Sequence, residues 1–295
     1  MEKVLEISNL SKNYGRITAV KDLTLDVGPG HVFGILGPNG SGKTTTLSII
    51  TGIIAADTGS YRWFGQETHA GIRKNIGSMI EVPNFYPYLN LIRNLNIVAR
   101  IKGKDLSDID RVLKLVNLWD RRKSRFDTLS LGMKQRLALS AVLLGEPSVL
   151  VLDEPANGLD PEGIAEVREI ILREREKQKT IIMASHILDE VEKVCTHVAV
   201  LKNGESISQG RVHELLTADD PVIVLCEEAG RLKDEIVRAG LSESIEMKDN
   251  ELVIVLSKGK SARDINEFAF SKGIVLDHLE TRKKSLESKF LELVK

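Results

Sequence analysis

A glycine-rich segment near the N-terminus, residues 37–44, has the residue types that bind phosphate. It reads Gly-Pro-Asn-Gly-Ser-Gly-Lys-Thr and fits the pattern G-x-x-x-x-G-K-[ST]. Glycines let successive backbone N–H groups point at phosphate oxygens, and a helix that follows adds the positive end of its dipole. Lys43 can reach the β- and γ-phosphates, and the Thr44 hydroxyl can ligate Mg²⁺. The segment predicts a site for ATP and Mg²⁺, with the ATP-binding residues Gly37, Pro38, Asn39, Gly40, Ser41, Gly42, Lys43, Thr44 and Thr45.

Two adjacent carboxylates, Asp153 and Glu154, follow four apolar residues about 110 positions after Lys43. In that position Asp153 would hold Mg²⁺ through water, and Glu154 would polarise the attacking water as a general base. Many strands end in acids, so this pair by itself is a weak signal. Its combination with the glycine-rich segment predicts a site that cleaves a nucleotide phosphate.

These groups need strand ends to position them, and the sequence supplies such strands. Residues 31–36 form a short apolar run before the loop, and residues 44–51 continue as a helix that Gly52 stops. This context disfavours the alternative, a glycine-rich turn that fits the pattern by chance. Residues 149–152, a helix at 163–177 and a strand at 180–184 give a βαβ rhythm, which indicates a parallel sheet.

Other segments flank this sheet. Residues 4–27 alternate apolar and polar side chains around a turn near residues 13–16, which predicts an antiparallel strand pair, and residues 55–65 predict a further strand. Helical periodicity dominates from about 82 to 145, so we expect an inserted, mostly helical subdomain. A hairpin is expected around Asn203-Gly204.

The strand and helix pattern begins again beyond Pro221, in the order β-α-β-β-α-β of a small ferredoxin-like domain. Its last strand is expected at Val275–Leu279, followed by a helix at Ser285–Val294. We therefore predict a nucleotide-binding domain at residues 1–217 and an accessory or regulatory domain at 218–295. The apolar residues expected to form the second core are Val222, Val224, Ile236, Val237, Val253, Val255, Phe268 and Val275.

Composition excludes several classes. Lys plus Arg is 41 and Asp plus Glu is 42, so no general charge attracts nucleic acid or anionic lipid. The two cysteines, Cys195 and Cys226, make no disulfide framework, which favours a reducing compartment. The N-terminus lacks the apolar stretch of a signal peptide, and no window reaches the roughly 20 apolar residues that cross a bilayer. Any membrane-spanning part is expected on another chain.

Residues 129–136, Leu-Ser-Leu-Gly-Met-Lys-Gln-Arg, resemble the signature sequence of ATP-binding-cassette (ABC) ATPases. The common form is Leu-Ser-Gly-Gly-Gln, so Leu131 and Met133 depart from it, whereas Ser130 and Gly132 are kept. An ordinary helix cap at Ser130 is the alternative for this segment alone. The resemblance covers residues 4 to about 215. It implies an α/β P-loop cassette in which Ser130 and Gly132 touch the γ-phosphate bound by a second copy.

The resemblance assigns roles to further positions. Tyr14 resembles the aromatic residue that stacks on adenine, although it could be a surface residue of the hairpin. Residues 157–160 look like the loop that crosses the dimer interface, which places Asp160 in that interface. His186, after Ala184-Ser185, looks like the switch histidine that contacts the γ-phosphate; a purely structural histidine is the alternative.

Glu81 is a departure from the family. Members usually have a glutamine at this place, which links Mg²⁺ and the attacking water to the helical subdomain. A carboxylate could still ligate Mg²⁺, but it adds negative charge near the γ-phosphate. Glu81 is therefore predicted as a catalytic and Mg²⁺-binding residue, with a surface glutamate as the alternative.

Residues 78–81, 85–89 and 129–136 look like the bacitracin and lantibiotic-exporter branch of ABC proteins, and so does the tail at 284–293. The branch implies an ATPase, homodimeric when closed on ATP, that drives export of a peptide antibiotic or other amphipathic compound. A separate permease would hold it on the inner, cytoplasmic face of the cell membrane. The aromatic patch at residues 85–88 is the expected seat for the permease, unless these rings only pack the subdomain.

Two other functions compete with transport. A soluble ABC ATPase of DNA repair would need long coiled coils between the two phosphate-site motifs, and a ribosomal form usually has two cassettes; a nucleic-acid partner also lacks basic charge here. A nucleotide sensor that closes without turnover is left open by Glu81 and Met133, but Glu154 and His186 argue against it.

Overall fold

The computed structural model describes residues 3–67, 69–81, 84–217, 220–282 and 286–294. The chain divides into two compact units, Met1–Arg211 and Val212–Leu293. The predicted domain boundary at residue 218 and the predicted start of the helical subdomain near residue 82 lie outside the described residues, as does Ser285.

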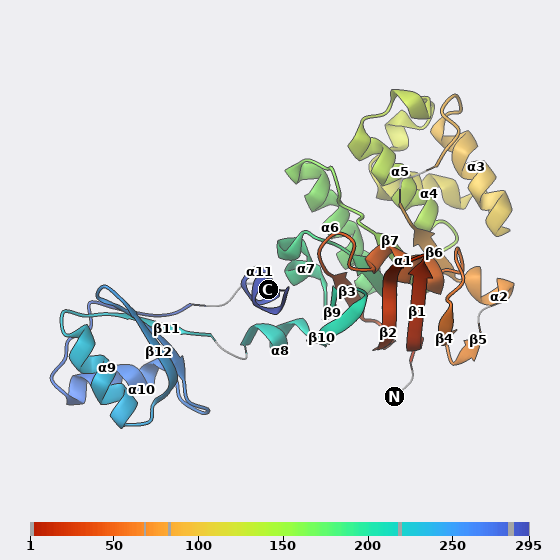
Figure 1. The fold of residues 1–295 in the computed structure, drawn as a ribbon. Coiled ribbons are helices and arrows are strands. Elements are labelled where there is room, and N and C mark those ends of the chain that lie inside the picture. The colour runs from red at the N-terminus through yellow and green to blue at the C-terminus, as the bar shows by residue number, and fades with distance from the viewer. Residues whose placement is uncertain (1–2, 68, 82–83, 218–219, 283–285, 295) are drawn as a thin grey trace. The chain divides into compact units, whose positions relative to one another are not determined.

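A six-stranded sheet forms the centre of the first unit (Figure 1), in the order β10-β9-β3-β8-β7-β6. All neighbours are parallel except β10, which pairs antiparallel with β9. Its strands are β3 (Val32–Leu36), β6 (Ile76–Met79), β7 (Val149–Asp153), β8 (Thr180–Ala184), β9 (His197–Lys202) and β10 (Glu205–Arg211). Asn203 and Gly204 both have positive φ, 51° and 84°, as the two-residue turn of the predicted β9–β10 hairpin requires.

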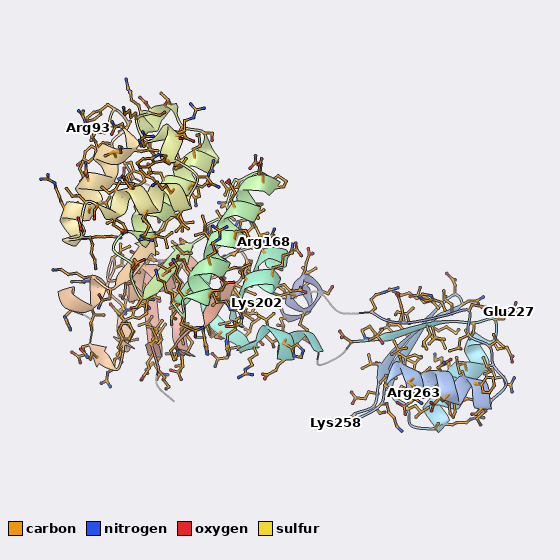
Figure 2. All side chains as sticks on the ribbon, turned by 180° about the vertical axis from the view of Figure 1, so that it is seen from behind. Arg93, Arg168, Lys202, Glu227, Lys258 and Arg263 are labelled. Atoms are coloured by element: carbon orange, nitrogen blue, oxygen red, sulfur yellow. The ribbon has the colours of Figure 1, made fainter. Side chains whose placement is uncertain are left out.

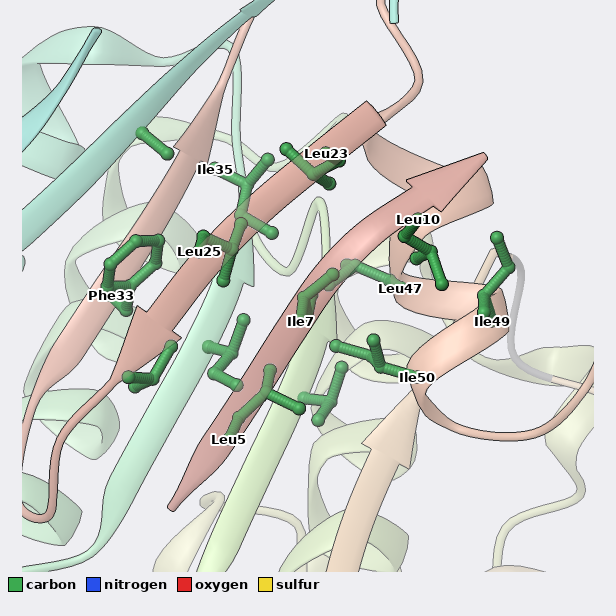
Figure 3. Close-up of a cluster of buried hydrophobic side chains, with 14 of the residues drawn as sticks. Leu5, Ile7, Leu10, Leu23, Leu25, Phe33, Ile35, Leu47, Ile49 and Ile50 are labelled. Carbon is green, nitrogen blue, oxygen red and sulfur yellow. The ribbon is translucent and has the colours of Figure 1, made fainter. Parts of the chain in front are cut away.

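A second, antiparallel sheet lies in the same unit, in the order β2-β1-β4-β5. Its strands are β1 (Leu5–Tyr14), β2 (Ile17–Val27), β4 (Thr58–Trp63) and β5 (Gln66–Glu67). Helix α1 (Lys43–Ile50) packs against it, and Figure 3 shows Leu47 and Ile50 beside Ile7 of β1. Phe33 and Ile35 of β3 belong to the same buried cluster. The core therefore fixes the helix that begins directly after the glycine-rich loop.

Side chains along the strands of the six-stranded sheet alternate between its two faces. Helix α7 (Leu188–Val194) lies close to β3 at Gly34. A Cβ on Gly34 would lie 3.1–3.2 Å from Cys195, Val198 and Val191. Arg168, labelled in Figure 2, joins α6 to α7 through an ion pair of 2.8 Å with Glu190. Helix α6 is Pro161–Glu176.

The insertion between β6 and β7 is helical, as predicted (Figure 1). It contains α3 (Leu91–Lys102), α4 (Asp108–Leu115), the short 3₁₀ turns η1 (Trp119–Arg121) and η2 (Phe126–Thr128), and α5 (Leu131–Leu143). Asn90 caps α3 by accepting from the Arg93 N–H at 2.9 Å, and Gly103 ends it at φ 63°. The sequence did not indicate the short helix α2 (Ala70–Arg73) before β6.

The second unit contains a four-stranded antiparallel sheet in the order β12-β13-β11-β14, the strand order of the predicted ferredoxin-like domain. Its elements are α8 (Val212–Thr217), β11 (Val222–Leu225), α9 (Ala229–Arg238), β12 (Ser242–Lys248), β13 (Glu251–Leu256), α10 (Ala262–Ser271), β14 (His278–Thr281) and α11 (Leu286–Val294). The α/β cassette with an antiparallel sheet, a helical insertion and a small C-terminal α+β unit is therefore confirmed.

Part of the predicted second core is wrong. Val237 is 57% exposed and Val275 is 81% exposed. On β13 the fully buried residues are Leu252 and Ile254, whereas Val253 and Val255 are only partly buried. Alternate side chains of a strand face opposite ways, and both faces of β13 are apolar, so the pattern did not identify the inner face. The last strand also begins at His278 instead of Val275.

Candidate nucleotide-binding site

The predicted chemical groups follow the carboxyl ends of four adjacent strands. The glycine-rich loop follows β3, Ser185 and His186 follow β8, Glu154 follows β7, and Glu81 lies just beyond β6. Parallel neighbours place these ends at one edge of the sheet, where open α/β sheets bind ligands. The sheet order thus brings together groups that are far apart in sequence.

The glycine-rich loop needs glycine for a steric reason at Gly42. Its φ is 101°, and an added Cβ would lie 2.3 Å from the Ala19 carbonyl oxygen of β2. The loop therefore packs directly on the antiparallel sheet. The turn of the β9–β10 hairpin also contacts it, because the Gly204 N–H donates to the Ser41 carbonyl at 3.2 Å. Both contacts fix the position of the helix N-terminus at Lys43.

Lys43 is buried within the loop that it is predicted to serve. Its Nζ donates to the Gly37 carbonyl at 2.8 Å and to the Pro38 carbonyl at 3.2 Å. Burial lowers the pKa of Lys43, and the nearby Glu154 and Asp153 oppose this shift. An ammonium has three donors, so one remains for a phosphate oxygen.

Asp153 and Thr44 have the oxygen atoms that a magnesium ion needs. Asp153 is 5% exposed, and its Oδ1 has no hydrogen-bond partner. Burial raises the pKa of Asp153, and the Thr44 side chain opposes that shift. In the described part of the chain no cluster of three or more His, Cys, Asp or Glu side chains could hold a metal. Mg²⁺ often uses one carboxylate together with substrate phosphates and water, so these residues fit it.

Glu154 and His186 are in direct contact. Glu154 Oε2 lies 2.8 Å from His186 Nδ1 and accepts from the His186 backbone N–H at 3.3 Å. Glu154 has φ 49°, in the left-handed region that few non-glycine residues adopt. Its backbone N–H donates to the Ala184 carbonyl at 3.0 Å. The glutamate is therefore fixed at a conformation in which its side chain meets the histidine.

A cavity of about 520 Å³ joins most of the predicted site residues. Glu154 and His186 lie at its wall together with the loop, and Tyr14 lines it too. Ile17, Ala19 and Asn157 also line it, although no role in binding ATP was predicted for them. The predicted residues that line it are Tyr14, Asn39, Gly40, Gly42, Lys43, Thr44, Thr45, Glu154 and His186.

The residues predicted to act across a dimer form a separate group. Ser130, Gly132 and Asp160 line a second cavity of about 390 Å³ and none of them lines the first. Ser130 caps α5 by accepting from the Met133 N–H at 3.3 Å, and Asp160 caps α6 by accepting from the Gly163 N–H at 3.0 Å. Two helix N-termini therefore lie beside one hollow.

Glu81 is exposed, and its side chain does not line the nucleotide cavity. Its φ is 60°, in the left-handed region, and its backbone lowers the pKa of the Asp153 carboxyl, against the effect of burial. The roles of Glu81 in catalysis and Mg²⁺ binding stay predictions.

Gln135 lies within the signature-like segment 129–136, but no role was predicted for it. It is buried on α5, and its Nε2 donates to the carbonyl of Pro155 at 3.1 Å and of Glu154 at 3.4 Å. The motif does not indicate this contact, since it depends on how α5 packs against the end of β7.

Known proteins resemble this chain over most of its length. A protein-family model described as ABC transporter matches residues 20–157. The bacitracin transport ATP-binding protein BcrA of Enterococcus faecalis is 31% identical over 299 residues, 100% of this chain and 97% of the relative. The lantibiotic transport ATP-binding protein SrtF of Streptococcus pyogenes is 39% identical over 204 residues, 69% of this chain and 89% of the relative.

A solved structure of an ATP-binding subunit of an ABC transporter matches with a TM-score of 0.66 at 28% identity. The match covers 72% of this chain and 91% of that one. Within the described residues, no helix is both long enough and apolar enough to span a membrane.

Proposed function

Because this chain belongs to the ATP-binding proteins of ABC transporters, we propose that it powers export of a peptide antibiotic or similar amphipathic compound. The family resemblance inferred from residues 129–136 is confirmed, and with it ATP hydrolysis coupled to transport by a separate permease. The export substrate is proposed from the relatives, whose names refer to bacitracin and lantibiotic transport. In this proposal the chain works on the cytoplasmic face of the membrane, held there by the permease.

The observation that carries the proposed mechanism is the separation of two half-sites on one chain. The first cavity has Lys43, Thr44 and Glu154, and the second has Ser130, Gly132 and Asp160. A second copy that turns its Ser130 face toward the first cavity would complete the contacts to the γ-phosphate. ATP would then hold two copies together until it is cleaved.

Within the proposed site each residue has one task. The loop N–H groups and Lys43 hold the phosphates, and Thr44 and Asp153 would hold Mg²⁺, which neutralises charge on the β- and γ-phosphates when bound. Glu154 accepts the proton of the attacking water, and His186 orients Glu154 through the 2.8 Å contact. The backbone of Glu81 favours the ionised form of Asp153, which would help that carboxylate hold Mg²⁺.

The aromatic patch, residues 85–88, is the proposed seat of the permease. Phe85 packs on Phe126 with ring centroids 5.3 Å apart, whereas Tyr86 and Tyr88 are 50% and 64% exposed. Asn94, only 1% exposed, accepts from the Tyr86 N–H at 2.9 Å and donates to the Tyr86 carbonyl at 3.2 Å. The buried amide thus fixes the backbone at Tyr86, whose exposed ring meets that of Tyr88 edge-on with the centroids 6.1 Å apart, and this supports a contact surface more than simple packing of the subdomain.

The test is reconstitution with the partner. The tagged chain is purified from native membranes together with its permease, and ATP turnover is measured in proteoliposomes with bacitracin, with a lantibiotic and with an uncharged small solute. The proposal expects turnover to rise with a peptide and to stay basal with the solute. Stimulation by neither peptide would contradict the proposed substrate class without affecting the family assignment.

A further inference from the structure

The wall predicted to receive adenine is the exposed end of one hairpin. Tyr14 is the last residue of β1 and Ile17 the first of β2, and the two are partners in the strand register. Both line the nucleotide cavity, yet Tyr14 is 49% exposed and Ile17 is 69% exposed. Side chains this exposed are not fixed by core packing, so polar contacts around the hairpin must order them.

Asp57 provides such contacts from a distant part of the sequence. It lies just before β4, in the segment that follows α1. Its Oδ2 accepts from the Asn13 backbone N–H at 2.7 Å and from Asn13 Nδ2 at 3.4 Å, and its Oδ1 accepts from Lys12 Nζ at 2.7 Å. One carboxylate therefore binds both residues that directly precede Tyr14.

Lys12 extends this contact to the ring itself. Its Nζ lies over the Tyr14 ring, 5.7 Å from the centroid. An ammonium is attracted to the face of an aromatic ring, so Lys12 occupies one face and leaves the other for a base. The hydrogen bond from Lys12 lowers the pKa of Asp57 below its ordinary value.

The other side of the turn is also fixed. The Thr18 hydroxyl donates to Asn13 Oδ1 at 2.8 Å, and the Asp57 backbone N–H donates to the Ser11 carbonyl at 2.9 Å. The turn between β1 and β2 is thus joined to the segment that follows the P-loop helix. A change in that segment would reach the Tyr14 ring without touching the phosphate loop.

We propose that Asp57 and Lys12 are positioning residues for the nucleobase, which hold the Tyr14 ring as a stacking surface. This inference rests on the proposed stacking of adenine on Tyr14. It goes further because it assigns base recognition to an ion pair that lies outside every nucleotide-binding motif of the sequence.

Calorimetry with two magnesium-loaded ligands tests the proposal on the full-length chain. MgATP has the base, and magnesium tripolyphosphate has the phosphates alone. We expect Asp57→Ala and Lys12→Met to weaken MgATP binding by about threefold to tenfold, the range of a cation–π contact, and to leave tripolyphosphate binding unchanged. If the alanine variant does not fold, Asp57→Asn replaces it and should likewise weaken MgATP binding while tripolyphosphate binding stays unchanged. The matched control is Asp26→Asn, whose carboxylate pairs with Lys3 at 2.9 Å at the other end of the same hairpin.

The Tyr14→Ala background separates the possible outcomes. There, Asp57→Ala should have no further effect on MgATP binding. If the Asp57 variants lose the same affinity for MgATP and for magnesium tripolyphosphate, Asp57 has a structural role and the inference is overturned. If Tyr14→Ala weakens MgATP binding but Asp57→Ala leaves it unchanged, Tyr14 stacks on the base and the inference about Asp57 is overturned. No effect of Tyr14→Ala would remove the stacking role and the inference together.

Discussion

Glu154 is held at three points, by strand β8, by helix α5 and by His186 in the loop after β8. Its N–H bonds to the Ala184 carbonyl of β8, its carbonyl accepts from Gln135 of α5, and its carboxylate meets His186. A residue with φ 49° keeps that conformation only when its surroundings fix it. At the scale of single residues, the site therefore depends on a strained glutamate whose position several segments determine.

We predict that Glu154→Gln keeps ATP binding but lowers turnover by at least about 100-fold, the scale of losing a general base. The amide cannot accept the proton of water, and it no longer repels the γ-phosphate. Steady-state phosphate release and calorimetry with MgATP measure the two effects. Glu67→Gln, on the exposed strand β5, is the control, and near-normal turnover of the Glu154 variant would contradict the assignment.

Site residues in short motifs could be predicted, and residues that act through packing could not. Lys43, Thr44, Asp153 and Glu154 follow from local patterns whose chemistry needs those residue types. Gln135 is missed because its partners are backbone carbonyls 19 and 20 positions away. Every residue has a backbone carbonyl, so the sequence does not show which one accepts from Gln135. That depends on how the helix and the strand pack together.

Helix α5 links the two half-sites at the scale of elements. Its N-cap Ser130 lies in the second cavity, and Gln135, little more than one turn later, donates to the backbone beside Glu154. Any shift of α5 that a partner's phosphate causes at Ser130 would therefore reach the glutamate of this chain.

Gln135→Leu should lower turnover roughly tenfold or more, because a small displacement of a catalytic group is costly, while ATP affinity stays unchanged. Leucine is close in size but removes the donor to the Pro155 carbonyl, whereas the Glu154 carbonyl still accepts from the Asn157 N–H at 3.1 Å, so thermal unfolding should show a loss of about 1–3 kcal/mol. Lys134→Met on the same helix is the control, since Lys134 lies over the Phe126 ring and away from Glu154. Equal loss of affinity and turnover in the Gln135 variant would argue for general damage.

The order of the helices and strands could be predicted more fully than which face of each strand is buried. The alternation of strands and helices predicted a parallel sheet in the first unit and the ferredoxin-like order in the second, because hydrophobic period and turn residues distinguish strands from helices. The inner face of β13 could not be chosen, since Leu252 and Val253 are equally apolar and only the packing of α9 and α10 decides between them.

Two hydrophobic core clusters of the described residues share no residue. One includes residues from Val4 to Leu201, and the other includes residues from Val222 to Ile274. All predicted nucleotide-binding residues precede residue 190. The predicted separation at residue 218 and the accessory role of the second part remain proposals that truncation can test.

Truncation after Ala218 should leave a chain that is soluble, binds MgATP and hydrolyses it, because the first core is complete without the rest. Circular dichroism, calorimetry and phosphate release check the three properties. The full-length chain is the control, and a second truncation after Arg211 tests whether α8 belongs with the second unit. An insoluble product that cannot bind nucleotide would mean that the two parts depend on one another.

We expect a second copy to complete the phosphate site, and the mass of the Glu154→Gln variant in saturating MgATP measures whether two copies stay together. Light scattering after size exclusion should give twice the 32.7 kDa of one chain with ATP and one chain when Ser130→Arg is added. A variant that binds ATP fully and still has the mass of a single chain would contradict it.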